Sequence, residues 1–70
     1  MTRARDTNPV KLAREAKGML LIELAERIGR CAAFVSNVEG GFVPSQLARR
    51  KQIADVLDTT PEQLWPAEYS

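Results

Sequence analysis

Apolar residues at helical spacing, interrupted at short intervals by glycine or proline, are the feature that most limits what this chain can fold into. No segment of four to eight residues alternates strictly between apolar and polar side chains, as a half-buried strand would. One segment instead has the i, i+3, i+4, i+7 spacing of an amphipathic helix, at Leu21, Leu24, Ala25 and Ile28. Gly29 follows directly and ends that helix. The chain therefore predicts an all-α fold built from short helices.

Capping residues and helix breakers predict where these helices lie. Asn8 followed by Pro9 is typical of a helix N-cap with proline at the first helical position, and Ser45 and Thr60 are further N-cap candidates. We expect five helices in one domain over residues 9–66, at about 9–17, 20–28, 31–38, 45–57 and 61–65. Residues 1–8 would form a flexible basic leader and residues 67–70 a tail.

Length and composition exclude several classes of protein. Seventy residues give a single small core, and histidine, the commonest general base and metal ligand, is absent. The one cysteine excludes an internal disulfide and a cysteine-rich zinc site. Apolar runs such as Met19–Ile22 are far too short to cross a membrane. We expect a cytoplasmic protein that is not an enzyme, is not bound to a membrane, and holds no metal and no cofactor.

Charge is distributed unevenly along the chain. Residues 1–51 contain all ten basic residues and five acidic ones, a net charge of +5, whereas residues 52–70 contain four acidic residues and no basic one. A positive body with a negative end suits a polyanionic partner, although a mixed, solvated surface explains the same pattern.

Residues 20–38 have the pattern of two helices joined by a short turn. Ala25 is small enough for two helices to cross closely, and Gly29 tolerates the positive φ of a tight turn. Ile28, Val35 and Val38 would fill the angle between the helices. This is the helix-turn-helix pattern, in which the second helix enters the major groove of DNA, although small helical bundles also contain such positions.

The same residues, with others, resemble a known family. The chain is similar to Cro/repressor-type (XRE) helix-turn-helix domains over about residues 9–65, at Arg14–Met19, Leu24, Ala25, Ile28, Gly29, Val35, Ser36, Glu39, Gly41, Ile53, Ala54, Leu57, Leu64 and Trp65. The resemblance implies a compact five-helix, lambda-repressor-like DNA-binding domain. It also implies a small repressor-like transcriptional regulator, of bacterial or phage type, that binds double-stranded DNA as a homodimer.

The resemblance also assigns roles to individual residues. Positions that read bases in the family fall on the helix at 31–38, at Cys31, Ala32, Ala33 and Asn37, with Ser36 beside them. Arg14 and Glu39 fall on a structural ion pair between the first and third helices. Basic residues that are candidates for phosphate contacts are Arg30, Arg27, Arg3, Arg5, Lys17 and Arg49, and Arg30 is the strongest of them.

Departures from the family pattern keep a second hypothesis open. Ala32 and Ala33 offer no hydrogen bond to a base, so only Asn37 has an amide suited to adenine. Apolar residues occupy positions that relatives expose, at Leu20, Leu21, Phe42 and Val43. These four, with Trp65, would either enlarge the core or contact a protein partner. The alternative function is a protein-interaction module on the same fold, such as an anti-repressor, an antitoxin-like protein or an assembly partner. Cys31 would be a small residue in a capping position or a redox sensor.

Overall fold

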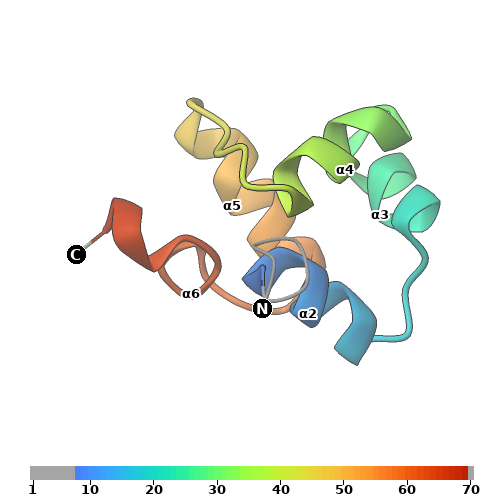
Figure 1. Cartoon of the computed structure of the whole chain (residues 1–70), viewed down its shortest axis with the longest axis horizontal. Coiled ribbons are helices and arrows are strands. Elements are labelled where there is room, and N and C mark those ends of the chain that lie inside the picture. Colours follow the sequence, from blue (N-terminus) through green and yellow to red (C-terminus); the bar gives the residue numbers. More distant parts are fainter. Residues whose placement is uncertain (1–7, 70) are drawn as a thin grey trace.

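The helices of the computed structural model, which describes residues 8–69, are short and arranged at steep angles to one another (Figure 1). They are α2 (Pro9–Ala16), α3 (Leu21–Ile28), α4 (Ala32–Glu39), α5 (Leu47–Val56) and α6 (Pro61–Leu64), followed by the 3-10 turn η1 (Pro66–Glu68). Within residues 8–69 there is no strand. The all-α prediction is confirmed, and each helix lies within two residues of its predicted bounds.

The first cap forms as predicted. The Asn8 side chain accepts a hydrogen bond of 2.9 Å from the Val10 amide, and Pro9 occupies the first position of α2. The Asn8 side-chain amide also donates to the Val38 carbonyl at the end of α4, over 3.4 Å. One residue therefore begins α2 and attaches it to another helix.

A left-handed glycine joins α3 to α4. Gly29 has φ +70° and ψ +31°, and the next amide, that of Arg30, donates to the Ala25 carbonyl at 2.9 Å. A residue with a Cβ rarely adopts this conformation, so glycine permits the abrupt turn. Ala25 is fully buried, and α3 has its most extensive helix contact with α4.

The start of α5 differs from the prediction. Ser45 is exposed and does not cap the helix, which begins two residues later with Gln46 in the N-cap position. The Arg50 side chain donates from Nε to the Pro44 carbonyl at 2.6 Å, a contact that ties this loop to the first turns of the helix. Leu47, the first residue of α5, is 65% exposed.

The C-terminal end is more ordered than the sequence predicts. Thr60 caps α6 by accepting from the Gln63 amide at 3.3 Å, while the Gln63 side chain accepts from the Thr59 hydroxyl at 2.6 Å. Where a tail was expected, residues 66–68 form η1. Arg50 holds this turn with an ion pair to Glu68 at 3.7 Å and a guanidinium 5.8 Å from the centre of the Tyr69 ring.

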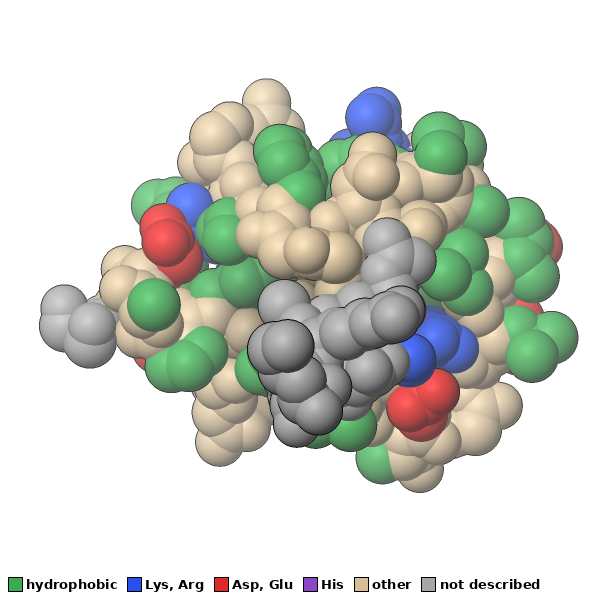
Figure 2. Space-filling model, in the orientation of Figure 1, with side chains coloured by type: hydrophobic (Ala, Val, Ile, Leu, Met, Phe, Trp, Pro, Cys, Tyr) green, Lys and Arg blue, Asp and Glu red, His purple; other side chains and the backbone are tan. Residues whose placement is uncertain are grey.

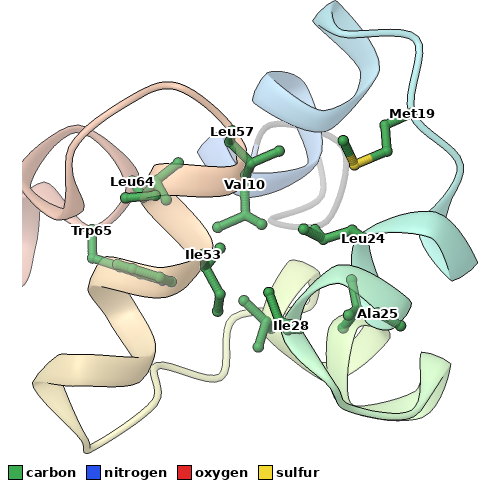
Figure 3. Close-up of a cluster of buried hydrophobic side chains, with 12 residues drawn as sticks. Val10, Met19, Leu24, Ala25, Ile28, Ile53, Leu57, Leu64 and Trp65 are labelled. Carbon is green, nitrogen blue, oxygen red and sulfur yellow. The ribbon is translucent and has the colours of Figure 1, made fainter.

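The core lies where the five helices α2 to α6 converge, and Figure 3 shows its side chains as sticks. Val10, Leu24 and Ile53 come from three different helices and are at most 1% exposed. Leu64 and Trp65 close the core at the C-terminal side, where the Trp65 Nε1 has no hydrogen-bond partner among residues 8–69. Fully burying a valine, leucine or isoleucine side chain contributes about 1.5–3 kcal/mol to the stability of the fold. Among the described residues no helix is long and apolar enough to cross a membrane.

Candidate nucleic-acid interface

One side of α4 packs against the core, and the other side is exposed to solvent. Val35 and Val38 are each 1% exposed and belong to the core. Ala33 and Asn37, which lie one helical turn apart on the opposite side, are exposed. Cys31 at the N-cap is exposed as well. Ala32 and Ser36 are half-buried between the two sides. Of the five residues assigned to base reading, three are therefore accessible and two are partly covered.

An ion pair fixes the C-terminal end of α4. Arg14 on α2 donates from Nε and Nη2 to the two carboxylate oxygens of Glu39, at 2.6 and 3.2 Å, and from Nη1 to the Met19 carbonyl at 2.7 Å. The Arg14 and Glu39 side chains are only 11% and 4% exposed. The hydrogen bond that Arg14 donates to the Glu39 carboxylate is the main reason that the pKa of Arg14 is raised above its ordinary value. The predicted structural ion pair is confirmed.

Two exposed arginines precede α4 in the chain. Arg27 is on the last turn of α3, and Arg30 is in the turn that follows. Arg30 places its guanidinium carbon 4.7 Å from the centre of the Phe34 ring. Neither arginine has an acidic partner among residues 8–69, so both charges are available to an anion.

Two other candidates for phosphate contact, Lys17 and Arg49, already bind partners within the protein. Lys17 pairs with Asp58 in the turn between α5 and α6, a hydrogen bond that lowers the pKa of Asp58. Arg49 donates from Nη1 to the Ile28 carbonyl at 2.6 Å, where α3 ends. Both side chains therefore join parts of this fold, and the structure favours a stabilising role for them. Arg3 and Arg5 lie outside the described residues, as does the rest of the predicted leader over residues 1–8 except Asn8, which caps α2 and is not part of a flexible segment.

Figure 2 shows how charged side chains are distributed over one face of the molecule. On the face shown in Figure 2, lysine and arginine side chains gather in small separate groups, two of them beside acidic side chains, and hydrophobic side chains are scattered over the same face. On this face an anion would meet separate small groups of positive charge and not an extended basic field.

The apolar residues proposed for a protein interface divide into two groups. Leu20 and Phe42 are 63% and 52% exposed, whereas Leu21 and Val43 are half-buried and pack against the core. Trp65 is only 6% exposed, and of its two predicted places, core or interface, its side chain occupies the core.

Sequence reasoning missed a concave site between α4 and the start of α5. Phe34 on α4 is half-buried, and the centre of its ring lies 6.1 Å from that of Phe42 in an edge-to-face arrangement. Arg30 and Arg49 approach the same ring. The spacing of Arg30 and Phe34, four residues apart across a helix start, was the available signal. No group of three or more side chains suited to a metal occurs in residues 8–69.

Comparison with protein-family models, with curated proteins and with solved structures finds no match to this chain.

Proposed function

We propose that this protein binds double-stranded DNA, with α3 and α4 acting as a helix-turn-helix and α4 lying in the major groove. The observation that carries the proposal is the open side of α4, where Asn37 is exposed and the exposed, unpaired cations of Arg27 and Arg30 stand at the helix start. The major groove, about 12 Å wide, admits one α-helix.

Each residue on this surface has a distinct role in the proposal. The Asn37 side chain makes no hydrogen bond to residues 8–69, so its amide is free to pair with the edge of an adenine. Ala33 offers only a methyl group, which suits contact with thymine. Arg27 and Arg30 would hold backbone phosphates, which give affinity and register but no sequence choice.

Base reading by one amide and one methyl group is limited, which makes a homodimer part of the proposal. Two copies would place two α4 helices about 34–36 Å apart, one turn of DNA, and double the number of bases read. Bound protein would then regulate transcription by occupying its site.

The test is selection from a pool of random duplexes, followed by sequencing, at two salt concentrations. We expect enrichment of a palindrome with half-sites about 10 base pairs apart. Asn37→Ala should relax the preference at one base pair per half-site, at a cost of about 1–3 kcal/mol. Arg27→Gln should instead weaken binding to all sequences alike. The slope of log K against log salt concentration should become shallower by about 1, as for the loss of one phosphate contact.

Lys17→Gln is the matched control, because it removes the same charge from the pair with Asp58. It should leave both affinity and preference nearly unchanged. Binding that enriches no sequence, or that falls equally in the Arg27 and Lys17 variants, would contradict the proposal. The alternative, a protein-interaction module, would then be favoured by the exposed side chains of Leu20 and Phe42.

A further inference from the structure

A pocket of about 260 Å³ lies between the first half of α4 and the start of α5. We call it the arginine–phenylalanine pocket, defined by Arg30, Phe34, Phe42, Ser45, Gln46 and Arg49. Pro44 also lines it, and the Pro44 carbonyl is held by Arg50 at 2.6 Å. The wall formed by the loop before α5 is thereby fixed to the helix that follows.

The apolar part of the pocket is aromatic and incompletely covered. The Phe34 and Phe42 rings meet at 74° with their centres 6.1 Å apart. Phe34 is half-buried, but Phe42 is 52% exposed, although an aromatic side chain of this size is usually covered in a stable fold. The exposed part of the Phe42 ring is a surface against which another flat ring can pack.

The polar part of the pocket is positive and contains no acidic residue. The guanidinium carbons of Arg30 and Arg49 lie 4.7 and 5.9 Å from the centre of the Phe34 ring. Arg49 already donates to the Ile28 carbonyl and to Gln52, but Arg30 has no hydrogen-bond acceptor in the described part of the chain. The side chains of Ser45 and Gln46 at the rim likewise make no hydrogen bond to residues 8–69. The pocket thus presents several donors and two positive charges beside an open aromatic ring.

We propose that this pocket binds a small aromatic anion, with one ring and one phosphate or carboxylate group. The ring would pack against Phe42, while the anionic oxygens accept hydrogen bonds from Arg30 and from the rim residues. The volume is slightly below the range of about 300–1,000 Å³ for drug-sized ligands, so one ring with one charged group is the appropriate size. A neutral ring would leave Arg30 without an acceptor, and a simple anion would leave Phe42 uncovered.

The position of the pocket links it to DNA binding. Arg30 is a phosphate candidate in the proposed function, and here the same guanidinium binds the anion. A bound ligand therefore competes with the DNA backbone for Arg30. This competition rests on the proposed function, whereas binding of the ligand to the free protein does not.

The first experiment is a titration of the ¹⁵N-labelled full chain by NMR, without DNA, using phenyl phosphate and benzoate in parallel. At least one of them should shift the amide signals of Ser45 and Gln46 in a saturable manner, and the stronger of the two identifies the preferred anionic group. Inorganic phosphate and benzyl alcohol, which carry only the charge or only the ring, should bind about tenfold more weakly. Equal binding of inorganic phosphate, or the absence of saturable shifts, would overturn the proposal.

Two variants with the same loss of charge locate the site. Arg30→Gln should weaken binding by about tenfold, and Arg27→Gln, three residues away and outside the pocket, should not. Both arginines are exposed, so both variants should remain folded. Phe42→Leu, which keeps an apolar side chain but removes the ring, should also weaken binding. Equal loss in the Arg27 and Arg30 variants would refute a defined pocket.

The second experiment adds the stronger of the two ligands to the protein bound to a labelled duplex. Displacement of the duplex supports competition at Arg30. If the free protein binds the ligand but no duplex, the proposed function fails and the pocket stands. If the protein binds a duplex but the NMR titration gives no saturable shift, the pocket fails and the proposed function stands.

Discussion

Replacing Arg14 by methionine tests what holds α4 in place. The Glu39 carboxylate is 4% exposed and accepts both of its side-chain hydrogen bonds from Arg14, at 2.6 and 3.2 Å. Arg14→Met fills a similar space with apolar atoms but leaves this carboxylate buried with neither a counter-charge nor a donor among the described residues. The Met19 carbonyl loses its 2.7 Å hydrogen bond at the same time.

The expected loss is a large part of the total stability. Removing one partner of a buried ion pair costs about 3–5 kcal/mol, because the other charge stays buried. A domain of this length has a free energy of unfolding of about 3.5–10 kcal/mol, at roughly 0.05–0.15 kcal/mol per residue. Since 1 kcal/mol shifts the midpoint of a small domain by about 4–8 °C, Arg14→Met should lower Tm by at least about 12 °C.

Thermal and urea unfolding followed by circular dichroism measure this loss. Adding Glu39→Met to Arg14→Met removes the stranded charge and should recover most of the stability. Lys51→Met is the control, because it breaks an exposed pair with Asp55 at 3.4 Å and should cost no more than about 0.5 kcal/mol. A loss of less than about 1 kcal/mol in Arg14→Met, or a double variant no more stable than the single one, would refute the reasoning.

Three further predictions concern the turns. Gly29→Ala should cost about 1–2 kcal/mol in urea unfolding, because φ is +70° while a Cβ there meets nothing within 4 Å, and Gly29→Asn should cost less. Arg49→Met should lower the free energy of unfolding by about 1–3 kcal/mol, because the Ile28 carbonyl loses a charged donor; a change within error would exclude this capping role. Since Lys17 lowers the pKa of Asp58 from its ordinary 3.8, the Lys17→Met variant should be less stable than the parent protein above that pH, and the difference should vanish as pH falls through the lowered pKa. Urea midpoints measured against pH check this, and a difference that persists in acid would contradict it.

Local signals predicted much of the fold. Asn8, Thr60 and Gly29 act through hydrogen bonds or dihedral angles within a few residues, so the sequence is sufficient to place them. The buried side of α4 follows from helical periodicity, as Val35 and Val38 illustrate. The ion pair between Arg14 and Glu39 spans 25 residues, and it was the family resemblance, not a local pattern, that indicated it.

Residues whose partners are distant along the chain were assigned less well. The sequence made Arg49 a candidate for phosphate contact, because its acceptor, the Ile28 carbonyl, is 21 residues away and no local pattern indicates it. Arg50 contacts Pro44 before α5 and Glu68 after it, and no local pattern indicates either partner. Phe34 has helical core spacing, and only the arrangement of α4 and α5 reveals that it lines a pocket. In each case the function of the side chain depends on packing between helices, which periodicity does not specify.

The double role of Asn8 bears on how the protein opens. Its side-chain oxygen starts α2 and its side-chain amide reaches Val38, so fraying the first turn of α2 also breaks a hydrogen bond of α4. Arg14 provides a second connection between the same two helices. Local opening of either helix must therefore disrupt the other, and in native-state hydrogen exchange the slowest amides of α2 and α4 should share one opening free energy. The first helix, although it lies far from α4 in sequence, belongs to the same cooperative unit.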